Sequence, residues 1–306
     1  MAGLTKIQGF DLIQETYKYV GDHAIRADIL VPQTNYTGKR PAIARFHGGG
    51  LVMGDSLYMD WFPYWLSDLA LQHEAVIISA NYRLMPQATG VDIYHDVEDF
   101  WAWLFQSDTV SDILAAHTTP TEIDFAHLLV TGESAGGLLS INSALSHAAS
   151  GRGRDRDGIT AAIAMYPTVD MSSPDFTQPR SIPPFGQHFD ESIIDEILAG
   201  VPKDEPISST DGDYLPLMLA AIEYGRLGGW YARALYPLKQ VEKKGKKTKI
   251  PRGGITIIQG LNDTVVPPDH SEPFVAKLRK VTKGKPVHDL IQFVTHEGEH
   301  GFDGDP

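Results

Sequence analysis

Short apolar runs alternate with longer stretches of helical periodicity along most of the chain, and this alternation restricts the fold more than any other feature. A run that is apolar at every position predicts a strand buried on both faces. Apolar residues spaced three or four apart predict amphipathic helices. The predicted strands cover residues 15–20, 24–31, 41–46, 75–80, 128–130, 159–165, 254–258 and 290–294. The predicted helices cover residues 58–71, 93–105, 135–147, 191–198, 215–227 and 271–281.

Strands and helices in this order predict an α/β protein with a mostly parallel central sheet and helices on both faces. Gly21-Asp22 joins the first two strands and is a hairpin signal, so we expect an antiparallel edge. The rhythm breaks at residues 171–249, which are rich in proline and have no clear strand. Such a segment is typical of an inserted cap or lid. We therefore expect residues 1–170 and 250–306 to form the core and 171–249 a helical cap.

Composition and charge exclude several classes of protein. The 306 residues are 42% hydrophobic and 21% charged, with a net charge of −13. These are ordinary values for a globular chain that buries its own core, and the acidic balance argues against broad nucleic-acid binding. A run of lysines at 239–249 is the local exception, and we interpret it as a solvated loop with Gly245 at its tip.

Two absences bear on the compartment. The chain has no cysteine, which excludes disulfides and thiolate chemistry. We see no charged and apolar leader at the N-terminus and no run of about 20 apolar residues. We therefore expect a cytoplasmic protein without a membrane span.

A Gly-x-Ser-x-Gly motif centred on Ser134 directly follows the predicted strand at 128–130 and precedes the predicted helix at 135–147. A serine on a sharp turn between a strand and a helix exposes its hydroxyl at the edge of a sheet. Gly132 and Gly136 remove the Cβ atoms that would obstruct the neighbouring backbone. The motif therefore predicts a serine nucleophile.

A second glycine-rich motif, His-Gly-Gly-Gly at 47–50, follows the predicted strand at 41–46. A tetrahedral oxyanion needs two or three N–H donors at about 2.7–3.1 Å. Consecutive glycines let the backbone turn such donors inward, so we interpret this loop as part of an oxyanion hole.

A serine nucleophile on such a turn is followed along the chain by an acid and then by a histidine. Asp263 follows the predicted strand at 254–258, and His300 follows the strand at 290–294. We take Asp263 as the acid and His300 as the base. The alternatives nearby are Asp269 for the acid and His296 for the base, with His270 beside Asp269.

Residues 296–300 also match His-Glu-x-x-His, a zinc motif that works only on a helix. Here the pattern follows a β-rich run and has Gly298 at its centre, which disfavours a helix. We predict no metal site and no cofactor.

Together these motifs resemble the hormone-sensitive-lipase-like branch of the α/β-hydrolases. The matching stretches are His47-Gly48-Gly49-Gly50, Asn81-Tyr82-Arg83-Leu84-Met85-Pro86, Gly132-Glu133-Ser134-Ala135-Gly136-Gly137, Gly260-x-x-Asp263 and His300-Gly301-Phe302. One departure is Glu133, which stands where aspartate is common in the family. The resemblance implies the α/β-hydrolase fold and a serine carboxylesterase that acts on a small-molecule ester.

The resemblance also implies a role for each site residue. Ser134 would be the nucleophile, His300 the general base and then acid, and Asp263 the carboxylate that orients it. The oxyanion donors would be the amides of Ala135, Gly49 and Gly50, with His47 and Gly48 holding the loop in shape. In this family, a homodimer formed through an edge strand would also be unsurprising.

Substrate choice is expected to depend on aromatic residues of the 171–249 segment. The candidates are Phe176, Phe185, Phe189, Tyr214, Tyr224, Trp230 and Tyr231. Of these we select Phe185, Phe189, Tyr214 and Trp230 as substrate-binding residues. The same triad also serves lactonases, thioesterases, cyclases, transacylases and amide hydrolases. A ligand-binding protein on this scaffold, like the plant gibberellin receptors, is a further alternative, although such receptors typically lose the catalytic histidine.

Overall fold

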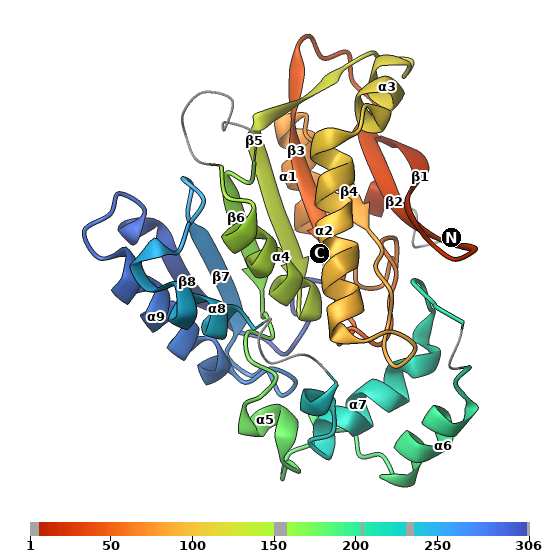
Figure 1. The fold of residues 1–306 in the computed structure, drawn as a ribbon, viewed down its shortest axis with the longest axis vertical. Coiled ribbons are helices and arrows are strands. Elements are labelled where there is room, and N and C mark those ends of the chain that lie inside the picture. Colours follow the sequence, from red (N-terminus) through yellow and green to blue (C-terminus); the bar gives the residue numbers. More distant parts are fainter. Residues whose placement is uncertain (1–5, 150–157, 203–204, 231–235, 305–306) are drawn as a thin grey trace.

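One mixed sheet of eight strands organises the protein, in the order β1-β2-β4-β3-β5-β6-β7-β8 (Figure 1). The computed structural model describes residues 6–149, 158–202, 205–230 and 236–304. Strands β1 and β2 form an antiparallel hairpin at one edge, and the strands from β4 to β8 run parallel. The strands are β1 (Phe10–Val20), β2 (His23–Pro32), β3 (Lys39–Phe46), β4 (Val76–Ala80), β5 (Glu122–Glu133), β6 (Ala161–Met165), β7 (Ile255–Gly260) and β8 (Ile291–His296).

Helices cover both faces of this sheet. In Figure 1, α2 and α4 lie in front of the strands and α1 lies behind them. Among the described residues, five α-helices belong to the alternating part of the chain: α1 (Tyr64–His73), α2 (Gly90–Gln106), α3 (Thr109–Ala115), α4 (Ala135–Ser146) and α9 (Glu272–Thr282). The predicted fold class, α/β with helices on both faces, is confirmed. None of the helices among the described residues is long and apolar enough to cross a lipid bilayer.

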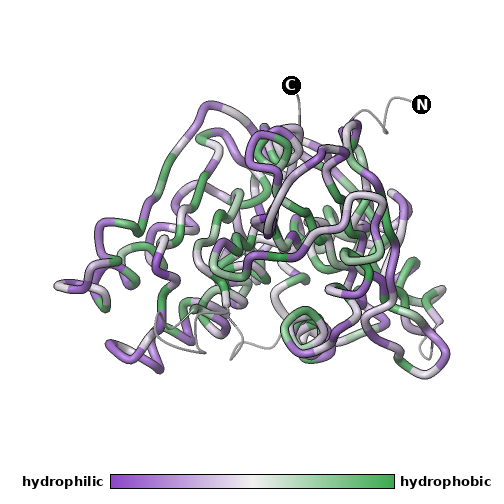
Figure 2. Tube along the Cα trace, turned by 90° about the horizontal axis from the view of Figure 1, so that it is seen from above, coloured by the Kyte–Doolittle hydropathy of each residue, from purple (hydrophilic) through white to green (hydrophobic). Residues whose placement is uncertain are grey.

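The alternation of side chains along each strand divides the core in two. Ala42 and Ala44 pack into the larger hydrophobic cluster, which contains the apolar residues of α2 and α4. Ile43, between them, packs into a separate cluster with Leu66 and Ala70 of α1. Successive side chains of a strand point to opposite faces, so a strand that is apolar at every position supplies both layers. In Figure 2 hydrophobic segments run through the middle of the molecule, whereas the outer turns are largely hydrophilic.

The described part of residues 171–249 contains helices and no strand. Its helices are α5 (Pro174–Thr177), α6 (Ser192–Gly200), α7 (Leu215–Glu223) and α8 (Pro237–Lys244). In Figure 1, α5, α6 and α7 lie together at the lower end of the sheet, whereas α8 lies beside α9.

Several predicted boundaries differ from the structure for local reasons. The helix expected from residue 58 begins at Tyr64, because Pro63 has an extended conformation and marks its N-cap. Strand β5 begins at Glu122, well before the predicted residue 128, because its first half carries polar residues that hide it from a search for apolar runs. Helix α3, which is short, was not predicted at all.

The lysine-rich run is not a plain loop, which corrects the sequence interpretation. Lys239, Lys243 and Lys244 lie on helix α8, and a short 3₁₀ turn, Gly245–Lys247, follows it. Helix α8 packs its buried Val241 inward and presents its lysines outward. A Lys-rich amphipathic helix has few apolar residues, so it resembles a loop in sequence.

Candidate active site

Ser134 occupies a strained turn between the end of β5 and the start of α4. Its backbone angles are φ 53° and ψ −116°, in the left-handed half of conformational space that non-glycine residues rarely adopt. Three backbone hydrogen bonds hold it there. Its amide donates to the Met165 carbonyl at 2.9 Å, and its carbonyl accepts from the amides of Leu138 at 3.2 Å and Thr168 at 3.3 Å. The predicted sharp turn at Ser134 is therefore present.

The two glycines of the motif let three backbone segments meet. A Cβ atom on Gly132 would lie 2.3 Å from the Gly136 carbonyl oxygen, and one on Gly136 would lie 2.0 Å from that of Phe46. Real Cβ atoms do not approach so closely, so only glycine fits. This packing sets Ser134 directly beside the end of β3 and the glycine loop that follows it.

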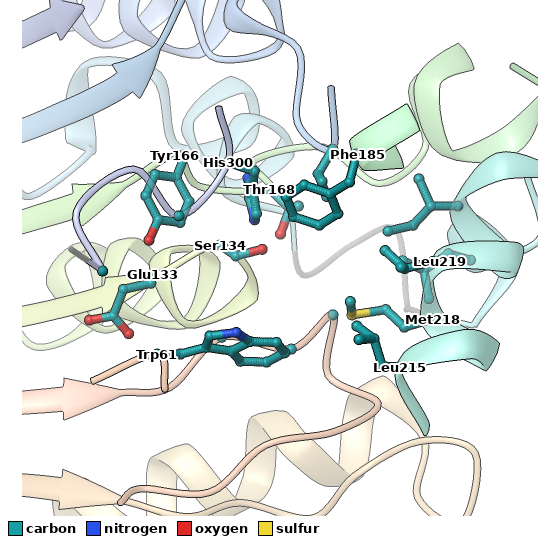
Figure 3. Close-up of a pocket in the computed structure, with 18 of the residues that line it drawn as sticks. Trp61, Glu133, Ser134, Tyr166, Thr168, Phe185, Leu215, Met218, Leu219 and His300 are labelled. Atoms are coloured by element: carbon teal, nitrogen blue, oxygen red, sulfur yellow. The ribbon is translucent and has the colours of Figure 1, made fainter. Parts of the chain in front are cut away.

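Asp263 and His300 meet from two separate loops. Asp263 follows β7, His300 follows β8, and His300 Nδ1 lies 2.8 Å from Asp263 Oδ2. The other carboxylate oxygen, Oδ1, accepts hydrogen bonds from the amides of Val265 at 2.9 Å and Val266 at 2.7 Å. A carboxylate only accepts, so Nδ1 carries the proton and Nε2 is left as the basic nitrogen. In Figure 3 the His300 ring points toward Ser134.

The alternative acids and bases lie elsewhere. Asp269 is exposed, and His270 is buried with its Nε2 accepting the Asp170 amide at 3.1 Å. His296 is the last residue of β8 and stacks on Phe302, with ring centroids 5.1 Å apart. The structure thus brings together Asp263 and His300 and neither alternative. It also places residues 291–296 in a strand, so the helix that the zinc motif requires is not formed there.

The glycine loop borders the same cavity as Ser134. Gly48, Gly49 and Gly50 all line it. Gly49 has φ +102°, and a Cβ there would lie 2.1 Å from the Met53 carbonyl oxygen. Ala135 is the first residue of α4, so its amide has no acceptor within the helix. The glycine loop predicted for an oxyanion hole therefore lines the cavity, and Ala135 directly follows Ser134, which also lines it.

His47 fixes the start of this loop. Its ring stacks on Tyr82 with centroids 4.4 Å apart, and the Tyr82 hydroxyl donates to the His47 carbonyl at 2.6 Å. His47 Nδ1 lies 2.8 Å from the Gly48 carbonyl oxygen. Burial lowers the pKa of His47 to about 4. The folded protein therefore holds the His47 ring in its neutral form at neutral pH.

This pKa predicts a loss of stability in acid. The unfolded chain protonates His47 near its ordinary pKa of about 6.5, so stability is full above that pH and falls as the pH drops toward 4. We expect the titration of His47 to lower the free energy of unfolding of the wild type by about 2 kcal/mol at pH 5 relative to pH 7.5. Urea unfolding of wild type and His47→Asn at both pH values measures this as the difference between their pH dependences. Equal pH dependences in the two proteins would contradict it.

A buried ion pair lies behind the nucleophile turn. Arg45 of β3 binds Glu133 through Nε to Oε1 at 3.1 Å and through Nη2 to Oε2 at 3.0 Å. Burial raises the pKa of the Glu133 carboxyl, and the Arg45 guanidinium counteracts the rise. Glu133, which stands where aspartate is common in the family, is therefore paired with Arg45, because the planar guanidinium fits both carboxylate oxygens.

Glu299 was missed by the sequence analysis, although it adjoins His300. Its Oε1 accepts the amides of Thr264 at 2.6 Å and of His300 at 2.8 Å, and its Oε2 accepts the Thr264 hydroxyl at 2.9 Å. One carboxylate thus joins the loop that carries Asp263 to the loop that carries His300. No sequence signal marks it, because its partner is 35 residues away.

We expect Glu299→Ala to lower kcat for ester hydrolysis about 10- to 100-fold while KM changes little, because small displacements of catalytic groups are this costly. Steady-state kinetics measures it. Glu299→Gln keeps an oxygen for the two amides and should recover most of the loss. Glu297→Ala, at an exposed glutamate two residues away, is the matched control. A Glu299→Ala enzyme with wild-type kcat would show that the bridge does not position His300.

Tyr166 and Asp303 complete the wall around His300. The rings of Tyr166 and His300 have centroids 4.4 Å apart. The Tyr166 hydroxyl donates to Asp303 Oδ1 at 2.5 Å, and Trp65 Nε1 donates to Asp303 Oδ2 at 2.9 Å. Burial and the Asp303 carboxylate hold the pKa of Tyr166 well above its usual value. These contacts join the His300 turn to the end of β6 and to α1, and no pattern in the sequence indicates them.

The cavity has a volume of about 330 Å³ and lies at the carboxyl ends of the parallel strands. Helix α7 and the following turn supply an apolar wall (Figure 3), made of Leu215, Met218, Leu219, Ile222 and Leu227. Of the four predicted substrate-binding residues, only Phe185 lines the cavity.

The remaining aromatic candidates lie in other places. Phe189, Tyr214 and Trp230 are half-buried and pack against the hydrophobic core, which corrects their selection as cavity residues. Phe176 does line the cavity, Tyr224 does not, and Tyr231 lies outside the described residues. The aromatic residues of a segment can be expected to be buried, but composition does not show whether their rings face the cavity or the core.

Comparisons with known proteins agree with the observed fold. A family model described as the alpha/beta hydrolase fold matches residues 43–209. A probable carboxylesterase of Phoma sp. is 30% identical over 98% of this chain and 92% of its own length, and an esterase of Mycobacterium tuberculosis is 28% identical over 51% and 41%. A Thermogutta terrifontis esterase structure shares the fold at TM-score 0.58 with 19% identity, over 97% of this chain and 84% of that chain. The chain belongs to the α/β-hydrolase family.

Proposed function

We propose that this protein is a serine hydrolase that cleaves a carboxylic ester through an acyl-enzyme, with Ser134, His300 and Asp263 as its catalytic residues. The observation that carries the proposal is the 2.8 Å contact between His300 Nδ1 and Asp263 Oδ2, with His300 lining the same cavity as Ser134. This arrangement supports the assignment of a nucleophile, a base and an orienting acid to these three residues. The likeness to carboxylesterases supports the choice of ester as substrate.

In the first half of the reaction, His300 Nε2 takes the proton of the Ser134 hydroxyl as Oγ attacks the ester carbonyl carbon. The carbonyl oxygen becomes an oxyanion, and the amides of Gly49, Gly50 and Ala135 would bind it. Each such donor is worth about 2.7–4 kcal/mol of transition-state stabilisation. His300 then gives the proton to the alcohol oxygen, the C–O bond breaks, and the acyl group stays on Ser134.

In the second half, a water molecule replaces the alcohol. His300 takes a proton from the water as its oxygen attacks the acyl carbon, and returns that proton to Ser134 Oγ as the C–Oγ bond breaks. The carboxylic acid leaves and the resting enzyme is restored. No step requires a metal or an organic cofactor.

The segment 171–249 acts in this proposal as the cap that selects the substrate. Helices α5 and α7 and the turn at Pro184–Gly186 contribute Phe176, Phe185 and the apolar residues of α7 to the cavity wall. An apolar wall favours an acyl or alcohol group of modest size, because burial of apolar surface stabilises the complex by about 25 cal/mol per Å². The cavity volume of about 330 Å³ favours short substrates.

Intact-mass labelling with a fluorophosphonate probe tests the proposal, together with hydrolysis of p-nitrophenyl esters with acyl chains of two to twelve carbons. We expect one probe per chain and turnover that is highest for the short esters. A folded protein that takes no probe would contradict the triad and favour a ligand-binding role. Labelling without turnover of any ester would instead indicate a lactone, a thioester or another acyl acceptor.

A further inference from the structure

Most buried polar side chains around the cavity already have partners. Glu133 is paired with Arg45, and Tyr166 donates to Asp303. Buried polar groups are nearly always satisfied in this way, because an unpaired one loses its hydrogen bonds to water without replacement. A cavity group that lacks a partner within the protein is therefore a candidate contact for substrate.

Thr168 is such a group. The residue is 3% exposed, and its Oγ1 has no hydrogen-bond partner among the described residues. Five other buried side-chain atoms share this condition in the described part of the chain, but Thr168 Oγ1 is the only one whose residue lines the cavity. A hydroxyl is both donor and acceptor, and its burial without a partner destabilises a fold. Valine would fill the same space without that cost.

Thr168 lies next to the nucleophile. It follows β6, and its amide donates to the Ser134 carbonyl at 3.3 Å. In Figure 3 its side chain is drawn between His300 and Phe185, above Ser134, whereas Trp61 and Leu215 lie on the opposite wall. The hydroxyl is thus on the His300 side of the reacting serine.

In the proposed mechanism, the His300 side of the cavity holds a particular half of the substrate. The alcohol oxygen of the ester must face His300, because it receives the proton that His300 holds when the bond breaks. The oxyanion must point toward the glycine loop. A group beside His300 is therefore placed along the alcohol half of the substrate.

We propose that Thr168 Oγ1 binds an oxygen atom in the alcohol half of the substrate, a few bonds from the ester group. This inference rests on the proposed function and adds a substrate class to it: esters of ether-, keto- or hydroxyl-bearing alcohols, in preference to esters of plain hydrocarbon alcohols. The apolar wall of α7 accommodates the rest of the molecule.

Matched esters isolate this contact. 2-Methoxyethyl butanoate and butyl butanoate differ by one oxygen in place of a methylene group in the alcohol half. Butyl methoxyacetate and butyl butanoate differ in the same way in the acyl half. We compare kcat/KM for each pair in wild type, Thr168→Val and Thr168→Ser, so that differences in intrinsic reactivity cancel between proteins.

We expect the wild-type preference for the methoxyethyl ester to fall about three- to tenfold in Thr168→Val and to persist in Thr168→Ser, as for the loss of one hydrogen bond. The acyl-half ratio should not change. Because the hydroxyl lacks a protein partner, Thr168→Val should unfold at the wild-type temperature or above it.

Each other result overturns the inference. An unchanged alcohol-half ratio in Thr168→Val contradicts the contact, and a change confined to the acyl half contradicts its placement. A Thr168→Val protein that unfolds at a lower temperature than wild type, or fails to fold, shows that the hydroxyl is structural. A wild type that takes no fluorophosphonate contradicts the proposed function itself, whereas a labelled, active enzyme with an unchanged ratio contradicts this inference alone.

Discussion

Ser134→Ala should abolish fluorophosphonate labelling and lower kcat for ester hydrolysis by about 10⁶-fold, the loss expected when a catalytic serine is removed. The reason is chemical, because alanine has no oxygen to form the acyl-enzyme. Some acceleration over water should remain from the glycine loop and the cavity. Intact mass and initial rates with the best p-nitrophenyl ester measure both effects.

Ser140→Ala is the matched control. Ser140 is buried on the same helix, α4, and its hydroxyl donates to the Gly137 carbonyl at 2.9 Å, away from the cavity lining. This variant should take the probe and retain activity. Ser134 has a positive φ, and an alanine at this position must adopt the same strained conformation. The unfolding temperature of Ser134→Ala should therefore be measured beside its rate. Labelling or turnover that survives in Ser134→Ala would place the nucleophile elsewhere.

Local patterns explain what could be predicted of the fold. The parallel strands are apolar at most of their buried positions because helices cover both faces, so each one contains a visible apolar run. Where a segment keeps polar residues, as in the first half of β5 or along α8, the same search fails. The strand order, with β4 between β2 and β3, depends on pairings between distant segments and leaves no local pattern.

The candidate site divides in the same way. Ser134, the glycine loop, Asp263 and His300 were selected because each follows a strand, and the parallel strands bring their carboxyl ends to one edge. Glu299, Tyr166 and Asp303 were missed because their roles depend on contacts across the fold. The cavity wall was sought among aromatic residues, whereas α7 builds it mainly from aliphatic ones. The side of a helix that faces a cavity follows from its docking and not from its composition.

Asp263→Asn should lower kcat by about 10⁴-fold at neutral pH, as expected when a catalytic histidine is held in the wrong tautomer. The amides of Val265 and Val266 both donate to Oδ1, so the asparagine oxygen must take that position. Its NH₂ group then replaces Oδ2 and faces His300 Nδ1, which must accept instead of donate. The proton moves to Nε2, and His300 loses the lone pair that takes the Ser134 proton.

This mechanism separates Asp263→Asn from a variant that is merely misfolded. Its unfolding temperature should fall only slightly, because the two amide contacts to Oδ1 are kept and the Gln259 side-chain amide, which loses Oδ2 as an acceptor, still donates to the Val266 carbonyl. Its KM should change little. Asp269→Asn, at the exposed aspartate six positions along the chain, should keep wild-type kinetics. A folded Asp263→Asn enzyme within tenfold of wild-type kcat would mean that Asp263 does not set the tautomer of His300, and the acid of the triad would then have to be sought elsewhere in the cavity, where Asp303 also lines the wall.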